Sequence, residues 1–231
     1  MHPAARESPV GNVVATDPDR EDPMTTTAVP APTVARRAAL GAAGGALWAL
    51  SPVAWAVADA RTLDPGTPSG VAVLATSGAV AVLGPLLVVA GLGALRSALG
   101  AAAGRAGTTG IVLAGLGLSA VALGNGIELA SLGARSGTSV AGYVVFYVGF
   151  LVAFAGALLV GRTVLRHRRD DASRIAGWLM VLAVPLCVGT VALGAVLAPD
   201  GEVGFAAGVA VPTGVAWLLL GRSLARGPKV R

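Results

Sequence analysis

Residues 84–95 read GPLLVVAGLGAL, a stretch with no charged residue and no alternation of apolar and polar positions. A transmembrane β-strand alternates such positions over about 10 residues, whereas a membrane-spanning helix needs about 20 mainly apolar residues. The stretch belongs to a longer apolar run, 71–95. The sequence therefore predicts a helix that crosses a lipid bilayer here.

The composition of the whole chain agrees with this prediction. Of its 231 residues 55% are hydrophobic and 13% are charged, and the mean hydropathy is +0.75. These values lie well outside the range of soluble globular domains, and disordered chains have low hydrophobicity and high net charge. We therefore expect a multi-pass membrane protein.

Six apolar runs are long enough to cross the hydrocarbon core of a bilayer. We predict an all-α polytopic membrane protein, a bundle of six transmembrane helices in three antiparallel hairpins. The predicted spans are 38–58, 71–95, 110–132, 140–161, 175–198 and 205–221. They form a domain over 36–226, between a disordered cytoplasmic tail, 1–35, and a short basic cytoplasmic tail, 227–231. Met24 is an alternative start of the chain.

Basic residues predict the orientation of these helices. Short loops rich in lysine and arginine stay on the cytoplasmic side, and 13 basic residues flank the spans on one side, against only Arg61 and Arg135 on the other. Both termini are thus expected in the cytoplasm of a bacterial-type cell. The 13 residues are Arg36, Arg37, Arg96, Arg105, Arg162, Arg166, Arg168, Arg169, Arg174, Arg222, Arg226, Lys229 and Arg231.

Two further interpretations concern arginines. The loop 162–174 carries five of them and is expected to attract anionic lipid, although it can equally serve as a topology signal alone. Arg36 and Arg37 precede a modest apolar region and an Ala-Val-Ala end at 56–58, which also fits a cleaved twin-arginine export signal. Cleavage would leave five helices with the same orientation. No nucleic-acid partner is expected, because the basic residues flank apolar runs.

One polar cluster is predicted inside the membrane. Glu128 lies within the third span, and an intramembrane carboxyl group usually faces a partner or a wet cavity. Asn125 lies on the same helical face, and antiparallel pairing places Tyr143 and Tyr147 of the fourth span at the same depth. The cluster is either a relay or pocket for a cation, proton or polar group, or a hydrogen-bonded helix clamp.

Other residues argue against most membrane chemistry. The chain has one cysteine, Cys187, and its two histidines lie outside the predicted spans, so we predict no enzyme activity, metal site or cofactor. Glycine pairs such as Gly41 and Gly45 favour close helix packing, within the bundle or in a homo-oligomer. The favoured function is a small permease or permease subunit; the alternative is a non-transporting scaffold or regulatory protein that acts through helix–helix contacts.

Four of the spans contain a proline, which removes a backbone hydrogen bond and can kink a helix. Broken helices line the substrate path of many transporters, but proline is also common in membrane helices generally. The four residues are Pro52, Pro85, Pro185 and Pro212.

Overall fold

The computed structural model describes residues 32–57, 67–134, 139–168, 170–197 and 202–227. Most of the two predicted tails and the end of the proposed cleavage signal lie outside these residues. Helix α1 begins at Pro32, within the first predicted tail, and α7 ends at Arg226, where the predicted domain ends. The described elements are α1 (Pro32–Val57), α2 (Pro68–Leu99), the 3-10 turn η1 (Gly100–Ala103), α3 (Gly104–Gly133), α4 (Val140–His167), α5 (Asp171–Val181), α6 (Ala183–Leu197) and α7 (Glu202–Arg226).

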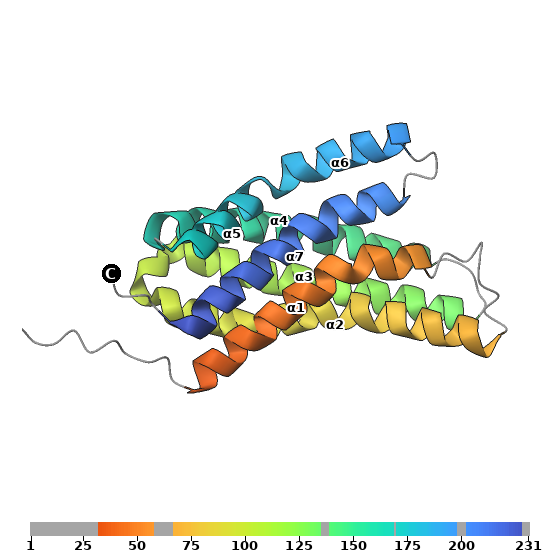
Figure 1. Cartoon of the computed structure of the whole chain (residues 1–231), viewed down its shortest axis with the longest axis horizontal. Coiled ribbons are helices and arrows are strands. Elements are labelled where there is room, and N and C mark those ends of the chain that lie inside the picture. Colours follow the sequence, from red (N-terminus) through yellow and green to blue (C-terminus); the bar gives the residue numbers. More distant parts are fainter. Residues whose placement is uncertain (1–31, 58–66, 135–138, 169, 198–201, 228–231) are drawn as a thin grey trace, which may run out of the picture.

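The contacts between helices form a closed ring, and Figure 1 shows the helices running lengthwise in one bundle. Helix α1 packs against α2, α2 against α3, α3 against α4, and α4 against α5; α5 and α6 both pack against α7, which returns to α1. The all-α class of the prediction is confirmed. The fifth predicted span is wrong as a single helix, because α5 and α6 meet at a bend of 62°.

Pro185 lies beside the bend, as the third residue of the run that begins at Ala183. Proline has no backbone N–H, so it cannot donate to the carbonyl oxygen of Val181, four residues earlier. Leu182 ends α5 by donating its N–H to Trp178, and Leu186 then donates to Leu182. By contrast, Pro52, Pro85 and Pro212 lie inside helices that continue past them.

Two described helical stretches are long and apolar enough to cross a membrane, Pro68–Ser131 and Val140–His167. A third qualifies if the bent pair Asp171–Val181 and Ala183–Leu193 is one span. Two or three of the predicted crossings therefore meet this test, not six. These stretches indicate a membrane location.

The surface of the bundle is apolar on almost every helix. A soluble protein rarely exposes contiguous apolar patches beyond a few hundred Å², and a helix that is hydrophobic all round is typical of a protein core or a bilayer. This pattern fits lipid as the surrounding medium. Among the exposed side chains are Leu50, Leu83, Leu86, Val112, Leu116, Leu123, Val144, Leu151, Val184, Val188, Leu193 and Val211.

Glycines bring the backbones of α3 and α4 into direct contact. A Cβ atom added to Gly124 would lie 2.6 Å from the backbone nitrogen of Phe146, and one added to Gly149 would lie 2.8 Å from that of Val121. The glycines recur every seven residues, the repeat of a left-handed antiparallel supercoil. The contacting pairs are Gly110 with Gly156, Gly117 with Gly149, and Gly124 with Gly142.

Glycines also bring α1 into close contact with two neighbouring helices. Gly44 lies against Gly84 and Val88 of α2, while Gly45 lies against Gly214 of α7. The predicted close packing through Gly41 and Gly45 thus occurs within the bundle: a Cβ on Gly41 would lie 3.2 Å from the Cα of Gly91. Small residues permit such approaches, and dispersion forces between the backbones then stabilise the pair.

Candidate functional site

Glu128 lies near the end of α3, and its residue is 9% exposed. Its Oε2 atom accepts a hydrogen bond of 2.8 Å from the backbone N–H of Ser139. Ser139 is the N-cap residue of α4, and its own Oγ atom accepts from the N–H of Gly142 at 3.2 Å. The carboxylate therefore lies at the positive end of the α4 dipole.

This arrangement is a capping box completed by a different helix. In the usual motif the N-cap serine binds the N–H three residues later, and a glutamate at that later position binds the N–H of the serine. Here the later position is Gly142, and a Cβ at this position would lie 3.3 Å from Oε2 of Glu128. Glu128 on α3 thus takes the role of the missing glutamate on α4.

Asn125 contacts another helix. Its Nδ2 atom donates to the carbonyl oxygen of Ala81 on α2 at 3.1 Å, and both residues are buried. Asn125 and Glu128 therefore connect α3 to its two neighbours in the ring, one on each side.

The two predicted tyrosines lie on the outside of α4. Tyr143 is 42% exposed and Tyr147 is 44% exposed, and their rings stack with centroids 6.2 Å apart. The structure places Tyr143 one residue after Gly142, beside the Glu128 cap. Donation from a tyrosine hydroxyl to Glu128 stays a prediction; the donor that the structure shows is the backbone of Ser139.

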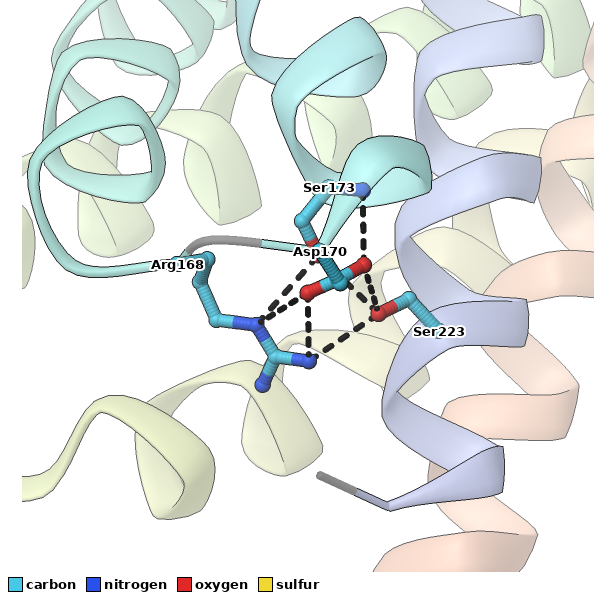
Figure 2. Close-up of polar contacts among 4 residues, drawn as sticks. All are labelled: Arg168, Asp170, Ser173 and Ser223. Carbon is cyan, nitrogen blue, oxygen red and sulfur yellow. Dashed lines mark hydrogen bonds and ion pairs between the residues drawn. The ribbon is translucent and has the colours of Figure 1, made fainter. Parts of the chain in front are cut away.

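A second polar cluster lies at the opposite end of the bundle and was not anticipated from the sequence. It joins the connection between α4 and α5 to the last turns of α7 (Figure 2). Asp170 accepts from Ser223 Oγ at 2.7 Å and from the N–H of Ser173 at 2.9 Å. Arg168 donates to Asp170 at 3.2 Å and to Ser223 at 2.9 Å, and the two serine hydroxyls lie 3.0 Å apart.

Asp170 remains ionised at neutral pH in this setting. Partial burial alone would raise the pKa of its carboxyl group, but hydrogen bonds from Ser223 and Ser173 and the charge of Arg168 outweigh this effect. The pKa of Asp170 therefore lies below its ordinary value of 3.8. Asp170 is also the N-cap of α5, so its charge complements the dipole of that helix.

The sequence around Asp170 indicates part of this polar cluster. An aspartate immediately before an apolar helix is typical of an N-cap, and Asp170 has this position. The contribution of Ser223 had no such signal, because it lies 53 residues from Asp170 in the chain. Only the packing of α5 against α7 brings these groups together.

The centre of the ring is packed with aromatic side chains. Trp48 of α1 donates from Nε1 to Oγ1 of Thr213 on α7 at 3.0 Å. Beside this bond is an apolar cavity of about 20 Å³, lined by residues that include Phe150, Phe154 and Trp217. A cavity of this size holds about one water molecule.

These sites hold helices together. Both oxygens of the Asp170 carboxylate accept hydrogen bonds within the protein, and the Glu128 carboxylate is occupied by a helix end. Within the described ranges no group of three histidine, cysteine, aspartate or glutamate side chains is arranged to hold a metal ion. No family model, curated protein or solved structure matches the chain.

Proposed function

We propose that this chain is a non-enzymatic, non-transporting scaffold of the cytoplasmic membrane that acts through contacts of its helices. The observation that carries this proposal is the centre of the ring, where Trp48, Phe150, Phe154 and Trp217 surround a cavity of only about 20 Å³. A small-molecule site usually has about 300–1,000 Å³. Glu128, for which a relay or a helix clamp was predicted, caps a helix and does not line this cavity.

The proposal includes six crossings of the bilayer. The stretch Pro68–Ser131 has 64 residues, and one straight helix of that length would measure about 96 Å, three times a hydrocarbon core of about 30 Å. Helices α2 and α3 instead lie side by side, because Gly100 and Gly104 adopt positive φ angles of 48° and 55° around η1. This stretch thus supplies two antiparallel crossings.

Helices α1 and α7 have the length for two more crossings. They contain 26 and 25 residues, about 39 and 37 Å of helix, and pack beside α2 and beside each other. With α4 and the bent α5–α6 pair, the number of crossings is six. We place the arginine-rich end, where α1 begins and α7 ends, in the cytoplasm.

A small permease is the second candidate, and the break between α5 and α6 favours it. Discontinuous helices form the substrate sites of several transporter folds. The 62° bend lies in the only such pair among the described helices. The two candidates differ in whether water reaches the centre of the ring.

Thiol labelling separates them. A Leu118→Cys variant places a thiol beside the central cavity, in a Cys187→Ser background that removes the single native cysteine. We expect a membrane-impermeant maleimide to leave this thiol unlabelled from both sides of the membrane. The same background with Ala101→Cys, at an exposed position of η1, is the control, and labelling is expected only in inside-out vesicles.

Each result has a defined meaning. Labelling of Leu118→Cys from either side would show a water-filled path and would contradict the scaffold proposal in favour of a permease. Labelling of Ala101→Cys in intact cells would leave the packed centre unaffected but would reverse the proposed orientation. Thermal unfolding of both variants, followed by tryptophan fluorescence, checks that the bundle is intact.

A further inference from the structure

Arginines from three helices meet at one corner of the bundle. Helix α1 begins, and α2 and α7 end, at this corner. The close approach of Gly41 to Gly91 fixes α1 beside α2, and that of Gly221 to Ala38 and Ala42 fixes α7 beside α1. We name this the α1–α2–α7 corner, and its arginines are Arg36, Arg37, Arg96, Arg222 and Arg226, all of them exposed.

The side chain of Arg37 crosses from α1 to α2. A Cβ atom added to Gly93 of α2 would lie 3.3 Å from the Nη1 atom of Arg37. Arg96 follows Gly93 by three residues and so lies on the same face of α2. Gly221, which touches α1 one turn above Arg37, directly precedes Arg222. Three positive charges from three helices therefore lie at one level.

Among the described residues, no ion pair joins these arginines to an acidic side chain: Asp170, which binds Ser223 beside Arg222, pairs with Arg168 instead. Helices α1 and α2 contain no aspartate or glutamate, and the single glutamate of α7, Glu202, begins that helix at its other end. Below the arginines, a small apolar cavity of about 10 Å³ separates the same three helices, with Leu95, Leu220 and Leu224 in its lining. The corner thus combines an exposed cationic rim with exposed apolar side chains farther along the same helices, such as Leu86 of α2 and Val211 of α7.

The loop that was expected to bind lipid differs in this respect. Arg168 of that loop is 15% exposed and pairs with Asp170, and Asp171 adds a second negative charge nearby. Of the arginines of 162–174 with described positions, Arg162, Arg166 and Arg174 remain exposed. Internal pairing therefore reduces the net charge that this loop can offer to a ligand.

We infer that the α1–α2–α7 corner binds the phosphate group of an anionic phospholipid, whose acyl chains lie along the apolar walls of the same helices. Guanidinium groups bind phosphate through paired hydrogen bonds, and arginines at helix ends reach the level of the headgroups. Each basic residue near an anionic surface contributes about the same small free energy, so the site with the most unpaired arginines binds best. The inference rests on the proposed membrane embedding but not on which side faces the cytoplasm.

Two triple variants with equal loss of charge test this inference. The first is R37Q/R96Q/R222Q at the corner, and the second is R162Q/R166Q/R174Q at the loop. Full-length protein in a neutral detergent is titrated with phosphatidylglycerol or phosphatidylcholine, and native mass spectrometry counts the bound lipids. We expect wild type to prefer phosphatidylglycerol, the corner variant to bind it at least about tenfold more weakly, and the loop variant to change by less than about threefold.

Several outcomes would overturn the inference. Equal losses in both variants would mean that binding follows net charge alone, and equal affinity for both lipids would mean that the phosphate is recognised without regard to headgroup charge. The acidic run 17–22, which precedes α1 in the sequence, is the competing occupant. If phosphatidylglycerol binds only to a chain that starts at Met24, the corner is occupied by that run instead.

A folding defect is distinguished by the conservative variant R37K/R96K/R222K, which keeps the charge. We expect it to bind phosphatidylglycerol more tightly than the glutamine variant, because it keeps the charge, but less tightly than wild type, because an ammonium group lacks the paired hydrogen bonds of a guanidinium group. Both variants should unfold at the same temperature. Failure of this test leaves the packed centre and its labelling experiment untouched, so the inference and the scaffold proposal can fail separately.

Discussion

Helices α3 and α6 are both apolar, yet they are held in place in different ways. Among the described glycines, three of α3 allow backbone contact with α4 along the whole length of the pair. Only one, Gly208 of α7, approaches the backbone of α6, which exposes Val184, Val188 and Leu193. In lipid, apolar character does not by itself drive helices together. The comparison shows that the spacing of small residues, more than hydrophobicity, determines which helices of this bundle are tightly bound.

The largest loss of stability is expected when one methyl group is added to the α3–α4 contact. A Cβ at Gly117 would overlap the backbone nitrogen of Ala153 and lie 2.6 Å from its Cα. We expect Gly117→Ala to lower the free energy of unfolding by about 3 kcal/mol, because backbone atoms cannot move aside as flexible side chains can. Unfolding in mixed micelles with increasing dodecyl sulfate, followed by tryptophan fluorescence, measures the change.

Gly126→Ala is the matched control on the same helix. Nothing lies within 4 Å of a Cβ atom at Gly126, so the substitution adds a methyl group without a clash. It should leave the protein unchanged or stabilise it by about 0.5 kcal/mol, because alanine is the better helix former. Equal destabilisation by both substitutions would show that the glycines act through helix flexibility and not through close packing.

The seven-residue repeat of these glycines is visible in the sequence, but the helix that each set contacts is not. Gly110, Gly117 and Gly124 are seven residues apart, as are Gly142, Gly149 and Gly156. The four-residue spacing of Gly41 and Gly45 predicted close helix packing, whereas the seven-residue repeat of the α3 and α4 glycines was not among the predictions. Even the full pattern does not say which helix faces which, because that choice depends on the connections and on all other contacts of the ring.

The next largest effect is expected at the polar cluster around Asp170. Asp170→Asn keeps an N-cap for α5 but removes the charge that Arg168 and Ser223 contact. We expect a loss of about 2 kcal/mol, and a larger loss for Asp170→Ala, which removes the cap as well. If Asn and Ala cost the same, the charge has no separate role in joining α5 to α7.

The same cluster makes stability depend on pH. The pKa of Asp170 is lower in the folded protein than its ordinary value of 3.8, so the folded state favours the ionised form. Its contribution is complete above the unfolded pKa and is lost as the pH falls through the folded pKa. The stability difference between wild type and Asp170→Asn should therefore shrink as the pH falls below about 4. A constant difference down to pH 2 would contradict this assignment.

A smaller effect is expected where Glu128 caps α4. Glu128→Gln retains an acceptor for the N–H of Ser139 but loses the interaction of a charge with the helix dipole, which costs about 1 kcal/mol. Ser139→Ala removes the other half of the capping box and should cost about as much. Because the two residues share one cap, the double variant should lose less than the sum. Full additivity would show that Glu128 stabilises something other than the α4 terminus.

The sequence identified the partner helix of this carboxyl group, and a hydrogen-bonded helix clamp was one of its two predicted roles, but the group that Glu128 contacts was not predicted. Reflection of the third span onto the fourth placed Glu128 near Tyr143 and Tyr147, and it does lie at the start of α4. Its partner is a backbone N–H, a group that every residue except proline carries, so residue types gave no hint of it. Pro185 lies beside the break after Val181, but the three other prolines of the predicted spans lie in helices that continue past them. Proline alone therefore did not identify the interrupted helix.

The smallest change is expected at α6 itself, from Pro185→Ala. Proline in the interior of a helix costs about 3 kcal/mol relative to alanine, but Pro185 lies in the first turn of α6, where backbone N–H groups have no partner within the helix. We therefore expect a stability change below about 0.5 kcal/mol. Distances between spin labels at exposed Trp178→Cys and Leu193→Cys, in the Cys187→Ser background, report the bend. If the bend straightens and stability rises by several kcal/mol, the proline strains a continuous helix. The difference between α6 and α3 would then come from that strain and not from the smaller number of glycine contacts to α6.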